Sequence, residues 1–185
     1  MAQNVLFTIG HSTHSIEEFI ALLNAHRVHH LVDVRSIPKS RHVPQFNTDA
    51  LASSLSAANI GYTHLKALGG RRSTRKDSLN TGWRNASFRG YADYMATPQF
   101  AEGLAALTQI ASTTPTAIMC AEAVPWRCHR SLISDAMILK GWEVRDILTA
   151  APAKERKPTP FLKIVDNHPT YPAPDQPDTR FDQPR

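Results

Sequence analysis

The chain has 185 residues, a hydrophobic fraction of 42 % and a net charge of +5, which fit one globular domain with a sizeable core. Because it shows neither a charged-then-apolar leader nor an apolar run of about 20 residues, we expect a cytoplasmic protein without signal peptide or membrane span. Two cysteines are too few for a disulfide scaffold, and in a reducing compartment they indicate metal, redox or nucleophilic use.

Strands and helices alternate along the predicted chain. A first strand is expected over 5–9, and Ser15 with Glu18 forms a capping box for the helix that follows. The other expected strands are 30–35, 62–65, 116–120 and 142–148. The other expected helices are 47–58, 91–95, 100–111 and 132–139. This alternation predicts a single α/β domain, with a mostly parallel open sheet of about five strands and helices on both faces.

Polar side chains follow the expected strands at their carboxyl ends, where open parallel sheets bind ligands. The residues at these ends are His11, Ser12, Asp33, Arg35, His64, Cys120 and Glu122. We expect them to converge on one cleft, with His11 and Asp33 as candidate catalytic groups and Ser12 and Arg35 as candidate ligand-binding groups. The alternative is that these polar residues only form turns.

A basic segment lies between Lys66 and Arg89, where seven cations face one acid, Asp77. Aromatic residues follow or interleave these charges, a composition suited to phosphates and stackable rings of nucleotides or nucleic acid. The candidate ligand-binding residues here are Arg71, Arg72, Arg89 and Tyr91. The alternative is a solvated loop whose aromatic residues close onto the core.

The densest collection of reactive groups lies between the expected strand 116–120 and the helix after Ser131. Candidate catalytic residues in this loop are Cys120, Glu122 and Cys128. Candidate ligand-binding residues are His129, Arg130 and Ser131. Both cysteines of the protein lie in this one loop, so we expect it to carry the function.

Three kinds of chemistry are open to this loop. A cysteine near a helix start and arginines can be a nucleophile. That arrangement, and the segment 32–35, resemble rhodanese sulfurtransferases or cysteine phosphatases, although Cys120 and Arg127 are seven residues apart. A zinc or iron site is a second option, but the spacing is poor, adjacent Cys and His side chains tend to point apart, and we assign no metal ligand.

The third option is a phosphate held near Arg130 and Ser131 at the helix N-terminus, with Glu122 or Asp33 as general base or sugar contact. Its alternative is a binding module without catalysis, in which Cys120 is a buried apolar group. The expected partner is an anionic small molecule or nucleic acid and not a membrane. The sequence indicates no particular cofactor or protein partner.

Several blocks resemble the DUF488 family, in the same order. They are 8–12, 32–40, 68–70, 88–95, 120–122 and 128–133, with 159–165 similar to its C-terminal segment. The resemblance implies a soluble prokaryotic α/β protein and, since the family is named for its unknown function, no particular activity. The chain departs from it at Asp146, where we expect a histidine before Ile147.

Residues 151–185 hold 8 of the 13 prolines, a composition that resists a packed core. Phe161 to Val165 and Pro169 to Tyr171 could form a small ribbon. We therefore expect an α/β domain over 1–150, a docked segment over 151–172 and a disordered tail over 173–185.

Overall fold

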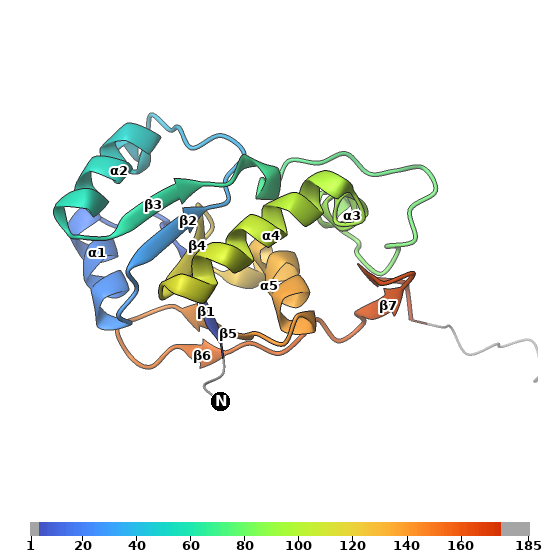
Figure 1. Ribbon diagram of the computed structural model, residues 1–185. Coiled ribbons are helices and arrows are strands. Elements are labelled where there is room, and N and C mark those ends of the chain that lie inside the picture. The colour runs from blue at the N-terminus through green and yellow to red at the C-terminus, as the bar shows by residue number, and fades with distance from the viewer. Residues whose placement is uncertain (1–3, 175–185) are drawn as a thin grey trace, which may run out of the picture.

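The computed structural model describes residues 4–174, and these contain one central sheet (Figure 1). Its strands are β1 Val5–Gly10, β2 His30–Asp33, β3 Gly61–His64, β4 Thr116–Cys120, β5 Glu143–Ile147 and β6 Lys154–Glu155. They lie in the order β3-β2-β4-β1-β5-β6, and all neighbours are parallel except the pair of β5 and β6. The prediction of a mostly parallel α/β sheet is confirmed, with one short antiparallel strand added at the edge.

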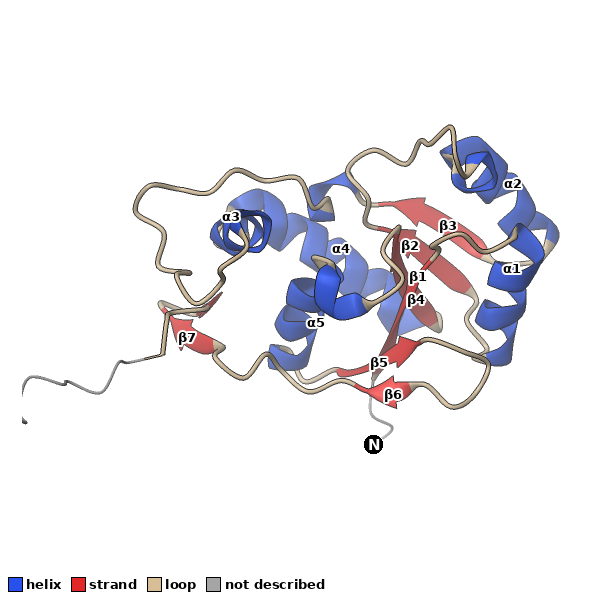
Figure 2. Ribbon diagram, turned by 180° about the vertical axis from the view of Figure 1, so that it is seen from behind, coloured by secondary structure: helices blue, strands red, loops and turns tan. Residues whose placement is uncertain are grey.

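Helices cover both faces of this sheet (Figure 2). They are α1 Ile16–Ala25, α2 Thr48–Ala57, α3 Ala86–Tyr94, α4 Pro98–Thr113 and α5 Arg130–Leu139. Apolar residues of α1 and α2 pack on one face around Phe46, and those of α3, α4 and α5 pack on the other around Leu6 and Ile118. Within residues 4–174, the structure has no helix long and apolar enough to cross a membrane.

Local sequence signals explain where most helices begin. Ser15 and Glu18 form the predicted capping box at α1, and Asn47 occupies the N-cap of α2. Helix α3 begins at Ala86, five residues before the predicted start, and the Asn85 side chain caps it by accepting from a backbone N–H. Its first turn lacks a regular apolar spacing, so periodicity missed it.

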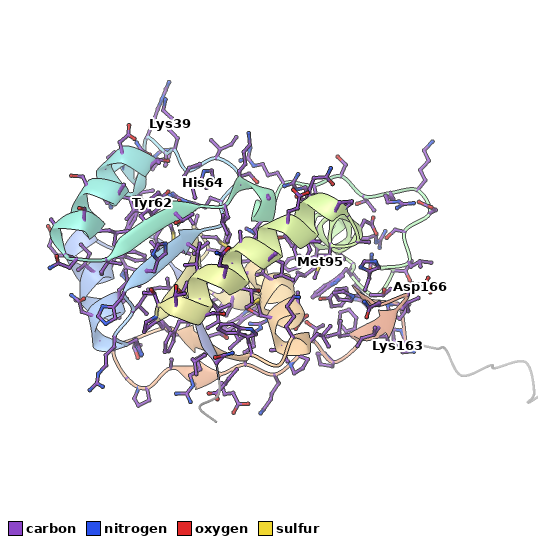
Figure 3. All side chains as sticks on the ribbon, viewed as in Figure 1. Lys39, Tyr62, His64, Met95, Lys163 and Asp166 are labelled. Carbon is purple, nitrogen blue, oxygen red and sulfur yellow. A yellow bond between two sulfur atoms is a disulfide. The ribbon has the colours of Figure 1, made fainter. Side chains whose placement is uncertain are left out.

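The strand order brings three carboxyl ends together at the centre of the sheet. Strand β4 lies between β1 and β2, with Gly10 beside Cys120 and Asp33 beside Met119. The neighbouring end of β3 carries His64 (Figure 3). The segments that follow β1, β2 and β4 therefore start within one small region.

The chain after β5 packs against the α3–α5 side. Strands β7 Lys163–Val165 and β8 His168–Thr170 form a hairpin whose turn residues, Asp166 and Asn167, have positive φ. Tyr171 is buried and donates from its hydroxyl to Asp135 at 2.9 Å. Of the expected disordered tail, residues 175–185 lie outside the described part of the chain.

His30 provides a test of the packing between β2 and β3. Burial lowers the pKa of His30 below its ordinary value of 6.5, so the folded protein binds a proton there less readily than the unfolded chain. Neutral His30 therefore contributes to the free energy of unfolding. We expect this contribution to be complete above pH 6.5 and to be lost as the pH falls through the lower pKa of the folded protein. Urea unfolding between about pH 8 and about pH 5 should thus show less loss of stability in His30→Gln than in the wild type. Equal losses in both proteins would contradict this assignment.

Candidate functional site

A cavity of about 390 Å³ opens at the carboxyl edge of the sheet. Its lining residues come from the segments after β2, after β3 and after β4 and from around the start of α3. They are Arg35, Ser36, Ile37, Gly70, Arg71, Asn85, Ser87, Phe88, Cys120, Glu122, Arg127, Cys128 and His129. Residues from four separate parts of the sequence thus share one wall.

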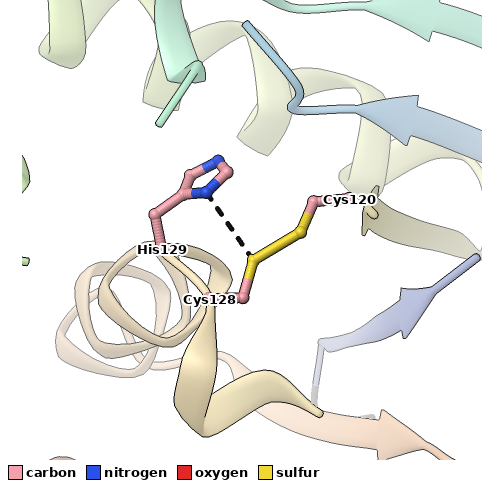
Figure 4. Close-up of side chains that lie close together, drawn as sticks. All are labelled: Cys120, Cys128 and His129. Atoms are coloured by element: carbon pink, nitrogen blue, oxygen red, sulfur yellow. Dashed lines mark hydrogen bonds between the residues drawn. A yellow bond between two sulfur atoms is a disulfide. The ribbon is translucent and has the colours of Figure 1, made fainter. Parts of the chain in front are cut away.

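Cys120, Cys128 and His129 form the most reactive cluster in this cavity (Figure 4). Cys120 ends β4, and Cys128 and His129 precede α5, so the loop between them crosses the mouth of the sheet. The two cysteines are 4 % and 3 % exposed and are joined as a disulfide. One donor atom from each of the three side chains lies within 4.8 Å of the others. The expectation that the adjacent Cys128 and His129 point apart is therefore wrong.

The imidazole of His129 has a defined orientation. Its Nε2 lies 2.8 Å from the backbone carbonyl of Val34, which can only accept a hydrogen bond, so Nε2 carries the proton. Its Nδ1 lies 3.6 Å from Cys128 Sγ. Burial lowers the pKa of His129 to about 4, despite the favourable contact with the Val34 carbonyl. The ring is therefore neutral at pH 7 and presents a lone pair to the sulfur atoms.

A buried ion pair holds the wall that β2 contributes. The Arg35 guanidinium donates to both carboxylate oxygens of Asp33, at 2.9 and 2.6 Å, and to the carbonyl of Phe46 at 2.8 Å. The Tyr62 hydroxyl donates to the same carboxylate at 2.7 Å. Asp33 is fully buried, so it supports Arg35 from behind and does not line the cavity.

His11 lies behind the same wall. Its ring stacks on Phe46 with centroids 4.3 Å apart, and its Nε2 is 3.3 Å from Arg35 Nη1. Burial, more than the nearby Arg35, lowers the pKa of His11. Ser12, with a φ of 44°, donates from its backbone N–H to the carbonyl of Ala121 at 3.0 Å. Both residues thus position the loop after β4 and lie outside the cavity lining.

Arg130 is buried under the loop and not directed into the cavity. Its guanidinium donates to the hydroxyl of Thr8 at 3.1 Å and to the backbone carbonyl of Glu122. Thr8 in turn donates to Asp146 at 2.8 Å. The carboxylate at the position where the family resemblance predicts histidine therefore belongs to a buried network beneath the loop, with Arg156 at 3.3 Å.

The predicted site residues divide into those that line the cavity and those that support it. The lining includes Cys120, Glu122, Cys128, Arg35, Arg71 and His129. The residues outside the lining are Asp33, His11, Ser12, Arg130, Ser131, Arg72, Arg89 and Tyr91.

The remaining four residues outside the lining also make contacts within the protein. Arg72 lies over the ring of Tyr94 at 3.6 Å, and Arg89 donates to the Trp83 carbonyl. The hydroxyls of Ser131 and Tyr91 donate to backbone carbonyls.

The cavity also contains residues to which the sequence assigned no role. These are Ser36, Ile37, Gly70, Asn85 and Ser87. Asn85 and Ser87 belong to the start of α3, and a cap pattern of Asn before an aromatic helix was the signal that could have found them. Gly70 is required because a Cβ there would lie 2.5 Å from the His129 ring.

A wider groove of about 770 Å³ adjoins the cavity and shares four of its lining residues, Asn85, Phe88, Glu122 and Arg127. Aromatic and basic side chains line the remainder. They are Trp83, Arg84, Trp126 and Phe161, with the backbone of Gly82. Trp126 is 62 % exposed, although tryptophan is mostly buried in folded proteins.

The cavity is bordered by positive potential. Arg71 and Arg127 are exposed at its edge, and the N-terminal ends of α3 and α5 meet it through Asn85 and His129. Helix N-termini carry partial positive charge. Glu122 is the acidic residue of the lining. An anionic group in this space would meet both cations and helix N-terminal ends.

Comparison with known proteins identifies the family of this chain. No curated protein and no solved structure matches the chain. The family model described as "Domain of unknown function DUF488" matches residues 15–137, which include β2 to β4 and all the residues that line the cavity. This match covers more than half of the chain and confirms the predicted resemblance. The protein therefore belongs to the DUF488 family.

Proposed function

We propose that this protein is a nucleotide-acting enzyme that binds a phosphate group in the cavity and a base in the adjoining groove. The observation that carries the proposal is the continuity of the two spaces, which share Phe88 and Arg127. A ligand with an anionic part and an aromatic part would fill both.

Charge supports the phosphate half of the proposal. Arg71 and Arg127 border the cavity, and the Asn85 and Ser87 side chains add hydrogen-bonding groups at the start of α3. Guanidinium groups form strong, often paired hydrogen bonds with phosphate oxygens. Arg35 lies in the same lining, and its guanidinium is fixed in place by the ion pair with Asp33.

Exposed aromatic surface supports the base half. Trp126 and the ring of Phe88 lie along the groove, and Trp83 stacks on Phe88 with centroids 4.8 Å apart. Base stacking on aromatic side chains contributes about 1–3 kcal/mol per base. Arg84 in the same groove adds a second cation for a longer nucleic-acid chain.

The Cys120, Cys128 and His129 cluster supports catalysis over binding alone. It stands in the wall of the cavity, next to where the phosphate would lie, and Glu122 supplies a carboxylate at the same opening. A thiol-dependent reaction of the sulfurtransferase or phosphatase kind, which requires the Cys120–Cys128 disulfide to be reduced, is the second candidate. It is favoured by the contact of Cys128 Sγ with the unprotonated Nδ1 of His129.

Removing a cavity cation should weaken ligand binding. We expect Arg71→Ala and Arg127→Ala each to lower the affinity for adenosine monophosphate by about ten-fold or more, because each removes a charged hydrogen-bond donor. Quenching of tryptophan fluorescence would report the binding, and Trp126→Ala should remove most of that signal. Titration at several salt concentrations would measure the electrostatic share.

Arg75→Ala is the matched control, since Arg75 lies on the same basic segment but pairs with Asp77 and lines a different cavity. Equal loss in all three arginine variants would indicate a diffuse charge effect and contradict the proposed site. A single-stranded oligonucleotide that binds much more tightly, with a steeper salt dependence, would identify nucleic acid as the ligand. If the protein binds adenosine monophosphate or the oligonucleotide but converts neither to a product, it is a binding module and not an enzyme.

A further inference from the structure

We propose that the reduced forms of Cys120 and Cys128, together with His129, constitute a zinc site with one open position toward the cavity. The proposal goes beyond the proposed nucleotide binding and does not depend on it. Its basis is the geometry of the three side chains and of the groups that hold them.

The donor set fits zinc, and so does the spacing of Cys128 Sγ and His129 Nδ1. The two sulfur atoms, bonded to each other in this structure, would separate on reduction to share the ion. Two thiolates and an imidazole are typical zinc ligands, and a tetrahedral ion with Zn–S of about 2.3 Å and Zn–N of about 2.0–2.1 Å places S and N about 3.5 Å apart. Cys128 Sγ and His129 Nδ1 are 3.6 Å apart, and all three donor atoms lie within 4.8 Å. Two thiolates also balance the charge of the ion, so a buried site stays neutral.

The surrounding backbone supplies the hydrogen bonds that metal ligands usually have. The carbonyl of Val34 accepts from His129 Nε2 at 2.8 Å, which leaves Nδ1 as the donor atom. The N–H of Arg130 donates to Cys128 Sγ at 3.5 Å and would stabilise a thiolate. These contacts orient a histidine and a cysteine that are adjacent in sequence toward the same point.

A disulfide gives the imidazole no such partner. Neither sulfur of a disulfide carries a proton, so in the oxidised form Nδ1 of His129 accepts no hydrogen bond from Cys128. A zinc ion would use this lone pair. Because all three residues line the cavity, the fourth coordination position faces it, which is the arrangement of catalytic zinc sites.

Zinc can bind only after the disulfide has been reduced to two thiols. A phosphine reductant, itself oxidised to the phosphine oxide with oxygen from water, delivers two electrons and two protons to the disulfide and yields two thiols. Zinc then displaces the two thiol protons, which are released to the solvent.

Metal binding to the full-length protein tests the site. After reduction we expect one zinc per chain by elemental analysis, and slower alkylation of both cysteines when zinc is present. Cobalt in the same site should give thiolate-to-cobalt charge-transfer absorption and the strong ligand-field bands of a tetrahedral ion. No ligand is added, so failure of nucleotide binding cannot affect the result.

His129→Gln and His64→Gln form a matched pair of variants. Both histidines donate from Nε2 to a backbone carbonyl after β2, His129 to that of Val34 and His64 to that of Arg35, but only His129 is part of the cysteine cluster. We expect zinc affinity to fall by more than about 100-fold in His129→Gln and to stay unchanged in His64→Gln. Reduced wild-type protein that binds no zinc or cobalt, or His129→Gln that binds like the wild type, would overturn the proposal. The effect of zinc on cysteine alkylation in the wild-type protein tests the proposal even if a variant does not fold.

Discussion

Asp33→Ala should cost about 3–5 kcal/mol of unfolding free energy, since it leaves a buried guanidinium without its counter-ion. Asp33 is fully buried and accepts from Arg35 and from Tyr62, and each of these donors would lose its partner. Such a loss is a large share of the about 5–15 kcal/mol that stabilises a typical domain. Urea unfolding, compared with the wild type at one pH, measures it.

The double variant Asp33→Ala with Arg35→Met separates the ion pair from simple packing. If the buried charge causes the loss, removing both partners should cost less than the two single losses combined. Asp77→Ala, at the exposed pair with Arg75, should have a far smaller effect because solvent screens it. Strictly additive losses at 33 and 35 would show that the two side chains act independently.

Gly10→Ala is expected to destabilise the protein by about 3 kcal/mol or more, because the added methyl group meets backbone and not a movable side chain. A Cβ at this position would lie 1.8 Å from the carbonyl oxygen of Glu122 and 2.9 Å from Ala123 Cα. That carbonyl also accepts from Arg130, so the loop is held from its other side. Urea unfolding would measure the loss, and faster alkylation of Cys120 and Cys128 after reduction would report displacement of the loop.

Gly61→Ala provides the comparison, since the same methyl group would meet the imidazole of His30 at 2.4 Å. That side chain is only partly buried and can turn away, so we expect a smaller loss than at Gly10. Similar losses at both positions would mean that the contact with Glu122 does not determine the need for glycine.

Periodicity and caps were enough to predict the parallel sheet and most elements, because β1, α1 and β4 each carry a local signal. Ser15 and Glu18 cap α1, and Thr116–Cys120 is a continuous apolar strand. The strand order could not be predicted in this way. It depends on β4 pairing with both β1 and β2, and these contacts join residues about a hundred positions apart.

The residues of the candidate site were likewise predictable only in part. Residue chemistry indicated Cys120, Glu122, Cys128 and His129, and these do share one cavity. Chemistry alone could not separate Arg71, at the cavity edge, from Arg130, which is buried against Thr8 and the Glu122 carbonyl. Whether an arginine faces solvent or core depends on the path of the loop, and no nearby residue specifies that path.

The central place of β4 also bears on how the molecule assembles. Strands β1 and β2 are not neighbours. Each has one outer partner, β5 or β3, and the two halves are joined only when Thr116–Cys120 pairs with both β1 and β2. The centre of the sheet thus closes through long-range contacts, whose loop-closure entropy slows folding relative to a helical bundle of equal size. Since Cys120 is the last residue of that strand, the pairing that joins the two halves of the sheet also brings Cys120 to the cavity wall.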